Sequence, residues 1–271
     1  MARPDQLNVQ VSGPTDARPV VFVHGFGCDQ HMWRLVAPRF AVDHHVVLLD
    51  LAGAGGSDPS AWDPDRYTSL EAYADDVLGV LRDLGLHDVV LVGHSVSAMS
   101  GLLAVVAEPE RFTGLVMIGP SPRYINDGDY RGGFTEADIE GLLESLDANY
   151  LGWSATMAPV IMGNPDRPDL GEELTTSFCR MDPSVARQFA RVTFLSDCRD
   201  ALPRVSVPTL VIQCREDVIA PLEVGEYVAH AVPHARLVVL DATGHCPHLS
   251  APDDTVAAIR AFLRSDLPAR A

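Results

Sequence analysis

The sequence contains no lysine, so arginine supplies all of its positive side-chain charge. Lysine and arginine together number 20 against 37 aspartates and glutamates, which leaves a formal net charge of -17. Nucleic acids and anionic membranes are bound by concentrated positive charge. The composition therefore argues against both as partners, and we expect an acidic, solvated surface that favours solubility.

Cysteine is also scarce, and no C-x-x-C pair is present. Five scattered cysteines are typical of reduced thiols in the cytoplasm rather than of a disulfide framework. The first residues, MARPDQLNVQV, lack the apolar segment of a secretory signal, and no apolar run approaches the ~20 residues of a membrane span. We therefore predict a cytoplasmic protein. The cysteines are Cys28, Cys179, Cys198, Cys214 and Cys246.

What the sequence does contain is an alternation of apolar strands and helical patterns. The 271 residues suffice for one large α/β domain or two small ones. Solid apolar runs indicate buried parallel strands, and the segments between them have helical periodicity. We expect a mostly parallel sheet that is covered by helices on both faces, with its strand ends meeting at one edge. The expected strands are 6–11, 20–24, 46–50, 89–92, 115–118, 209–213 and 237–240, and the expected helices are 70–84, 96–107, 223–231 and 254–263.

One region interrupts the alternation. Between about Arg123 and Leu202 no strand-like run occurs, and four helices are predicted over 136–150, 153–162, 170–181 and 185–196. We interpret residues 123–202 as a helical lid between two parts of a core, residues 1–122 and 203–271. The alternative is an independent helical domain, but strand-helix alternation resumes directly after this region.

A sharp strand-to-helix turn is predicted at Gly93-His94-Ser95-Val96-Ser97. This pattern is typical of the nucleophile elbow of α/β-hydrolases, G-x-S-x-G, in which the turn exposes the serine Oγ above the sheet. Ser97 replaces the second glycine, where strand and helix pass close together, so the match is imperfect. Ser95 is the candidate nucleophile.

A serine nucleophile needs a base, an acid that orients the base, and donors for the oxyanion. In this fold the chain order is nucleophile, acid, histidine. Asp217 follows the expected strand 209–213 and is the candidate acid, with Glu216 as its competitor. His245 follows the last expected strand and is the candidate base, with His248 and His94 as alternatives.

The remaining signals concern the oxyanion and metals. His24-Gly25-Phe26-Gly27 follows the first buried strand, so the backbone N–H groups of Phe26 and Val96 are candidate oxyanion donors. The histidines and cysteine of 245–248 lack a second ligand pair at metal-like spacing, so no metal is predicted. Cys28 and Cys246 are interpreted as packing residues.

Taken together, motifs along the whole chain are more specific than G-x-S-x-G alone. The chain resembles the RsbQ-type α/β-hydrolases, a group that includes a bacterial stress-response regulator and the karrikin and strigolactone receptors of plants. The resemblance extends from about Leu7 to Leu263, and it includes Ser97. The stretches that carry it are HGFGCDQ, DRY, VGHSVSAM, PSPRYIND, GGF, RQFA, SD, VPTLVIQC, VIAP and GHCPHLS.

The resemblance implies the triad Ser95, Asp217 and His245, with oxyanion donors at Phe26 and Val96. It also implies the α/β-hydrolase fold with a four-helix lid over an apolar pocket, and it requires no cofactor. The positions that match this pocket are Phe26, Phe134, Leu142, Trp153, Met157, Phe194 and Val218.

These features predict a serine hydrolase of the carboxylesterase or lactonase type that acts on a small hydrophobic ester or lactone. A second hypothesis is a ligand-responsive signalling protein with slow hydrolysis, for which the resemblance suggests a sensor-phosphatase partner. A carbon–carbon bond hydrolase or lyase uses similar residues. Dehalogenase and epoxide hydrolase chemistry would need a carboxylate in place of Ser95.

Overall fold

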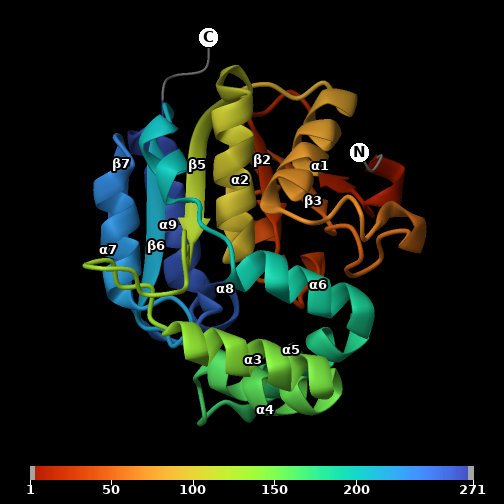
Figure 1. The fold of residues 1–271 in the computed structure, drawn as a ribbon. Coiled ribbons are helices and arrows are strands. Elements are labelled where there is room, and N and C mark those ends of the chain that lie inside the picture. The colour runs from red at the N-terminus through yellow and green to blue at the C-terminus, as the bar shows by residue number, and fades with distance from the viewer. Residues whose placement is uncertain (1–3, 268–271) are drawn as a thin grey trace.

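A sheet of seven strands runs through the centre of the molecule (Figure 1). The computed structural model describes residues 4–267. The strand order is β1-β3-β2-β4-β5-β6-β7, and every neighbouring pair is parallel except β1 with β3. The strands are β1 Gln10–Ser12, β2 Pro19–Val23, β3 His45–Leu49, β4 Val89–His94, β5 Phe112–Ile118, β6 Thr209–Glu216 and β7 Ala235–Thr243.

The central strands are buried on both faces, which explains why they appear in the sequence as continuous apolar runs. In β2, Val21 and Val23 belong to one hydrophobic cluster, while Val20 and Phe22 belong to the cluster on the opposite face. Successive side chains of a strand point to opposite faces, so both faces need apolar residues here.

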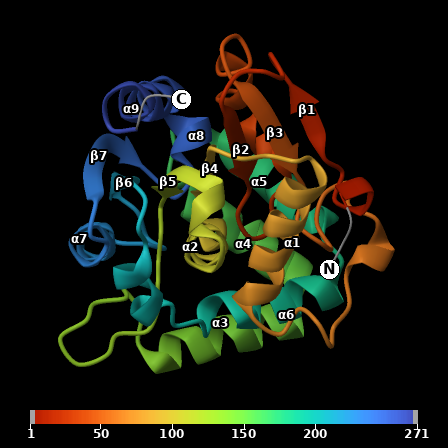
Figure 2. The ribbon, with the colours of Figure 1, turned by 90° about the horizontal axis from the view of Figure 1, so that it is seen from above.

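Helices cover the two faces of the sheet (Figure 2). On one face lie α1 (Leu70–Asp83), α2 (Val96–Ala107) and α7 (Leu222–Ala231). On the other face lie α8 (Pro247–Ser250) and α9 (Pro252–Ser265). None of the helices within residues 4–267 combines the length and the apolarity that crossing a membrane would require.

The first predicted strand is displaced. Residues Pro4–Gln6 form a 3-10 turn instead, and β1 begins only at Gln10. Leu7 is fully buried, and its carbonyl accepts the N–H of Asp50. Asn8 turns the chain with a φ of 47°, and its side chain donates to Asp50 Oδ2 at 2.7 Å. The alternation over residues 6–11 therefore reflects an anchored turn, and the edge strand starts after it.

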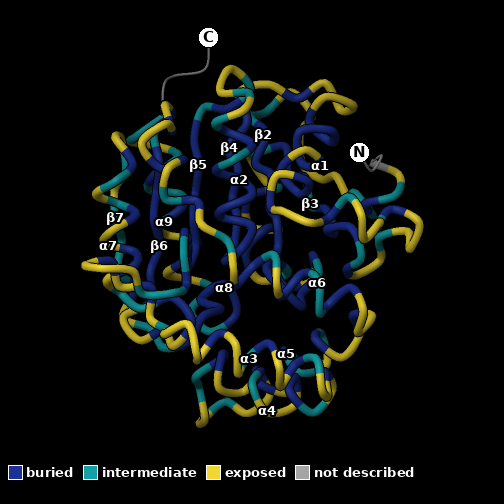
Figure 3. The backbone as a smooth tube through the Cα atoms, viewed as in Figure 1, coloured by how far each residue is buried: buried dark blue, intermediate teal, exposed yellow. Residues whose placement is uncertain are grey.

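Four helices lie between β5 and β6, and we call them the helical cap. They are α3 (Glu136–Ala148), α4 (Tyr150–Met162), α5 (Pro168–Arg180) and α6 (Pro183–Phe194). Figure 1 shows them gathered at one end of the sheet, and in Figure 3 much of their outer backbone is exposed. Their starts follow helix-capping chemistry: Thr135 and Asp138 form a capping box, and Asp182 caps α6.

Candidate active site

Three polar side chains meet at the edge of the sheet where β4, β6 and β7 end. His245 Nε2 lies 2.7 Å from Ser95 Oγ, and His245 Nδ1 lies 2.7 Å from Asp217 Oδ2. All three residues are buried. In this arrangement the imidazole can accept the serine proton through Nε2, while its Nδ1–H donates to the carboxylate. The three residues that chain order predicts are thus in hydrogen-bonded contact.

Ser95 occupies a strained backbone position between β4 and α2. Its φ of 57° and ψ of -123° lie outside the regions that non-glycine residues commonly adopt. Its N–H donates to the Ile118 carbonyl of β5 at 2.8 Å, which fixes the corner. Gly93 allows the turn, because a Cβ at this position would lie 2.2 Å from the Ser97 carbonyl oxygen.

Ser97, the departure from G-x-S-x-G, is fully buried. Its hydroxyl donates to the carbonyl oxygen of His24, just after the end of β2. A buried hydroxyl costs little when it is hydrogen-bonded. The serine therefore fits between helix and strand because a backbone acceptor is available there.

The structure distinguishes between the two candidate acids. Asp217 Oδ1 accepts the N–H groups of Ile219 at 2.8 Å and Ala220 at 3.1 Å, which leaves Oδ2 directed at His245. Glu216 is exposed, and its carboxylate accepts from the Thr243 hydroxyl at 3.3 Å. Only Asp217 contacts the imidazole.

Three other elements hold the loop that carries His245. The His245 N–H donates to the Ile161 carbonyl of α4 at 2.9 Å, and His94 Nε2 lies 2.8 Å from the His245 carbonyl oxygen. On another side Gly119 packs against the ring, since a Cβ on Gly119 would lie 3.0 Å from His245 Cε1. The imidazole is therefore fixed by contacts from the cap, the elbow and β5.

The predicted oxyanion donors flank Ser95. Val96 is the first residue of α2, so its N–H has no acceptor within the helix. Phe26 lies in the turn after β2, and it lines a cavity beside Ser95. A helix N-terminus also favours negative charge, which suits an oxyanion at this point.

The cavity beside Ser95 is small and mostly apolar. Its volume is ≈ 30 Å³, about that of one water molecule in the liquid, whereas ligand pockets commonly measure ~300 Å³ or more. Four of the side chains that line it form an aromatic cluster: Phe26 lies within 6.3 Å, between ring centroids, of Trp153, Phe178 and Phe194. A substrate larger than a few atoms therefore needs these side chains to move.

Only part of the predicted pocket lines this cavity. Phe26, Trp153 and Phe194 do so. Phe134, Leu142 and Met157 instead line a separate groove of ≈ 590 Å³ between α3 and α4, which Trp153 also borders. Val218 points outward, with 54% of its surface exposed, and its neighbour Ile219 lines the cavity in its place. The pocket prediction was wrong for these four residues. Phe134, Leu142 and Met157 are separated from the cavity by Trp153. Val218 points outward because its neighbours Asp217 and Ile219 point inward.

Comparison with known proteins shows the family of this chain. The profile of the alpha/beta hydrolase family matches residues 20–259. The chain belongs to this family. The predicted fold class is thereby confirmed, and the chain is an enzyme of the hydrolase class.

This alpha/beta hydrolase is similar over nearly its whole length to several known proteins. It is 42% identical to the strigolactone esterase D14 of Arabidopsis thaliana over 265 residues, which cover 97% of both chains. It is 38% identical to the karrikin insensitive 2 receptor CA of Petunia hybrida over 261 residues, or 96% of each. A hydrolase from Oleispira antarctica has a TM-score of 0.92 at 38% identity, with 96% of both chains covered.

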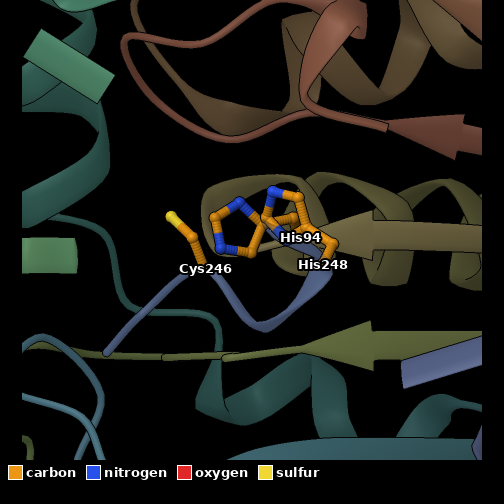
Figure 4. A group of neighbouring side chains, drawn as sticks. All are labelled: His94, Cys246 and His248. Atoms are coloured by element: carbon orange, nitrogen blue, oxygen red, sulfur yellow. The ribbon is translucent and has the colours of Figure 1, made fainter. Parts of the chain in front are cut away.

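Next to the candidate base His245, the residues His94, Cys246 and His248 form a buried group of potential metal ligands (Figure 4). Their ligand atoms lie within 4.8 Å of one another. Neither ring nitrogen of His94 is accessible to an ion, however. Nε2 hydrogen-bonds the His245 carbonyl oxygen, and Nδ1 is covered by Gly25, where an added Cβ would lie only 2.7 Å from it. The donor set is therefore poorly suited to an ion. His94 and His248 instead serve as neutral packing groups, because burial lowers the pKa of both.

Two thiols also line the cavity. All five cysteines are free, and Cys28 and Cys246 border the space beside Ser95. Burial raises the pKa of both thiols, so they stay protonated near neutral pH and do not compete with Ser95 as nucleophiles.

Sequence reasoning missed two residues of this site, Gly119 and Tyr124. Both follow β5 at the same edge of the sheet as the triad. Tyr124 lines the cavity beside Ser95, and Gly119 packs against the His245 ring. The position after a parallel strand could have identified them, but no motif marked their contacts.

Proposed function

We propose that this chain is a serine hydrolase that cleaves small apolar esters or lactones through an acyl-enzyme on Ser95. The observation that carries the proposal is the continuous pair of hydrogen bonds from Ser95 through His245 to Asp217. Relatives at 42% and 38% identity, one of them named an esterase, support the reaction class. No step requires a cofactor.

The reaction begins when His245 Nε2 takes the Ser95 proton as Oγ attacks the substrate carbonyl carbon. Asp217 accepts the Nδ1–H of the imidazolium and holds the ring in place. The N–H groups of Phe26 and Val96 stabilise the oxyanion, and each such donor contributes roughly 3 kcal/mol. His245 then protonates the leaving alcohol, and in the second half it activates a water molecule that hydrolyses the acyl-enzyme.

The cavity limits the substrate class. Its walls are mainly aromatic and aliphatic, and its free volume beside Ser95 is ≈ 30 Å³. A short acyl group or a compact lactone requires the least displacement of the aromatic residues. The helical cap thus acts as a lid, so a substrate reaches Ser95 only when cap side chains move.

The decisive test is Ser95→Ala, measured with p-nitrophenyl acetate and a fluorophosphonate probe. We expect turnover to fall by at least ~10³-fold and labelling to vanish, because Ser95 Oγ is the hydroxyl that His245 Nε2 contacts within residues 4–267. Ser97→Ala is the matched control on the same elbow, and it should retain labelling. Full labelling of the Ser95 variant would reject the assignment.

A second candidate function is a ligand-responsive signalling protein with slow hydrolysis. Strong similarity to a strigolactone esterase and to a karrikin receptor, over almost the whole chain, favours it. The finer assignments, an RsbQ-type protein with a sensor-phosphatase partner and a cytoplasmic location, stay predictions from sequence. A turnover number below about one per minute would favour signalling, since typical enzymes turn over ~10 times per second.

A further inference from the structure

Gln213 lies near the carboxyl end of β6, close to the turn that carries Asp217. The residue is fully buried, and its Nε2 donates to the Ala220 carbonyl oxygen at 2.5 Å. The same nitrogen donates to Asp217 Oδ2 at the longer distance of 3.4 Å. Both acceptors are oxygens, so the amide must face them with its nitrogen. The Gln213 side chain therefore joins β6 to both ends of the turn 217–220.

Helix α7 confines the Gln213 side chain. A Cβ on Gly225 would lie 2.9 Å from Gln213 Oε1 and 3.0 Å from its Cγ, so the helix approaches as closely as a glycine allows. Within residues 4–267, Gln213 Oε1 has no hydrogen-bond partner. A buried polar atom without a partner is unfavourable, and an apolar side chain would avoid that cost. The benefit of an amide at this position must therefore come from its nitrogen.

The turn that Gln213 holds is the one that orients the carboxylate of Asp217. The N–H groups of Ile219 and Ala220 donate to Asp217 Oδ1, and Oδ2 accepts from His245 Nδ1 at 2.7 Å. Ala220 thus has two contacts: its N–H binds the carboxylate, and its carbonyl accepts from Gln213. A hydrogen-bonded path therefore runs from Gln213 through Ala220 to the acid.

We propose that Gln213 is a positioning residue that holds the turn 217–220 in the geometry in which Asp217 Oδ2 accepts the His245 Nδ1–H. The proposal rests on the function proposed above. In the described part of the chain, the Gln213 amide donates to Ala220 and Asp217 and not to Ser95 or His245. It therefore acts on the reaction through Asp217.

The kinetic signature of this role follows from when the carboxylate is needed. Asp217 contributes most while the imidazole carries an extra proton, which happens in the transition states and not in the bound substrate complex. His245 takes a proton from Ser95 in the first half-reaction and from water in the second. A misplaced carboxylate should therefore slow both halves by a similar factor, so that kcat falls and KM stays nearly constant.

The first test is Gln213→Met in the full chain, which keeps the length of the side chain and removes the donor. We expect kcat for p-nitrophenyl acetate to fall about 10-fold, with KM within about 2-fold of wild type. The downfield proton NMR resonance of the His245 Nδ1–H, identified by its absence from His245→Ala, should move upfield or broaden. A merely structural role would lower the urea midpoint and leave kcat and this resonance unchanged.

Gln30→Met is the matched control for the loss of a buried amide. Gln30 is also buried, and its Nε2 donates to the Asn8 carbonyl oxygen at 2.7 Å, but it does not bind the turn 217–220. This variant should lose stability to a similar extent. Its kcat and its His245 resonance should be those of the wild type.

The second test displaces Gln213 without removing any polar group. Gly225→Ala places a Cβ against Gln213 Oε1 and Cγ, although alanine favours a helix more than glycine does. We expect a fall in kcat of about 3-fold to 10-fold with unchanged KM. Gly141→Ala is its control, because Gly141 lies within α3 and a Cβ there meets nothing within 4 Å.

Wild-type kcat and an unmoved His245 resonance in Gln213→Met would overturn the role of Gln213. If that variant does not fold, Gly225→Ala decides: activity equal to that of Gly141→Ala would overturn the proposal. Undiminished fluorophosphonate labelling of Ser95→Ala would instead overturn the proposed function, so the two failures are distinguishable.

Discussion

At the scale of single residues, Gly119 determines how closely the chain can approach the His245 imidazole. Its φ is 57°, in the left-handed region that side chains rarely adopt, and its N–H donates to the Ile212 carbonyl at 2.9 Å. A Cβ would lie 3.0 Å from His245 Cε1 and 3.2 Å from Nδ1. These distances are several tenths of an ångström shorter than ordinary contacts, so His245 would have to shift.

We therefore predict that Gly119→Ala lowers kcat/KM by roughly 10-fold to 100-fold, because small displacements of reacting groups have effects of that size. Gly128→Ala is a close control: Gly128 has the same φ of 57° and lies on the same connection, but a Cβ there meets nothing within 4 Å. Both variants should be destabilised by about 1 kcal/mol through backbone strain. Equal activity of the two would show that the imidazole does not depend on Gly119.

The residues that could be predicted from sequence are those that recurring motifs mark. Ser95, Asp217 and His245 each follow a strand, in the chain order of the fold, and the structure brings them together. Gly119 and Tyr124 follow β5 without a motif. Their contacts depend on how the connection after β5 folds back onto the site, and this is a tertiary property that local pattern does not encode.

At the scale of elements, hydrogen bonds join the helical cap to the loop that carries His245. Besides the bond from His245 to Ile161, Asn164 Nδ2 donates to the Thr243 carbonyl at 2.9 Å. Gly244, with a φ of 93°, allows this approach, since a Cβ on it would lie 1.8 Å from the Met162 carbonyl oxygen. The C-terminal end of α4 is therefore hydrogen-bonded to the loop that carries His245. A movement of α4 would therefore displace the loop that carries His245.

The middle of the cap instead packs through aromatic rings. Phe178 of α5 lies against Gly27, where a Cβ would come within 2.4 Å of the ring. The rings of Phe178 and Trp153 are stacked, with centroids 5.9 Å apart and planes inclined by 6°. Phe178 thus fills the space between the cap and the turn after β2.

We predict that Phe178→Leu enlarges the cavity and shifts chain-length preference toward longer acyl groups. In a series of p-nitrophenyl esters, kcat/KM for butyrate or hexanoate relative to acetate should rise about 10-fold, the value of one to two buried methylene groups. Stability should fall by about 1–3 kcal/mol. Leu151→Ala, at an exposed position of α4, should leave the profile unchanged. An unchanged profile in Phe178→Leu would mean that this ring does not limit the substrate.

Periodicity in the sequence predicted the boundaries of the helices more accurately than the residues that line the pocket. Val96–Ala107 forms a helix over the predicted range, because an apolar segment directly after the elbow must pack on the sheet. The pocket prediction failed at Met157 and Leu142, which lie on cap helices but on the far side of Trp153 from Ser95. A helical pattern shows which residues face inward, but it does not show how an intervening ring divides the interior.

At the scale of the whole molecule, two buried histidines link stability to pH. His94 and His248 are at most 2% exposed. Within residues 4–267, neither ring nitrogen of His248 has a hydrogen-bond partner. Burial, together with the neighbouring His245 and Arg34, lowers the pKa of His248 to about 3. Burial, together with His248 and His245, also lowers the pKa of His94 well below its usual value.

Between pH 6.5 and about 3 the unfolded chain therefore binds protons that the folded protein does not. Stability is greatest above pH 6.5 and falls as the pH decreases through this window, by about 1.4 kcal/mol per pH unit for each such histidine. Carboxylates titrate mainly below pH 5, so they contribute little to the slope above that pH. The histidines should therefore dominate the slope between pH 7 and pH 5.

This leads to a prediction for His248→Phe, which keeps an aromatic ring against Trp33, whose centroid lies 4.7 Å from that of His248. Urea unfolding at pH 7 and pH 5 should show a stability loss about 2 kcal/mol smaller in the variant than in the wild type, because one proton-binding site of the unfolded chain is gone. His87→Phe, which removes an exposed histidine, should retain the wild-type loss. Equal losses in all three proteins would mean that His248 takes up its proton in the folded state as readily as in the unfolded chain.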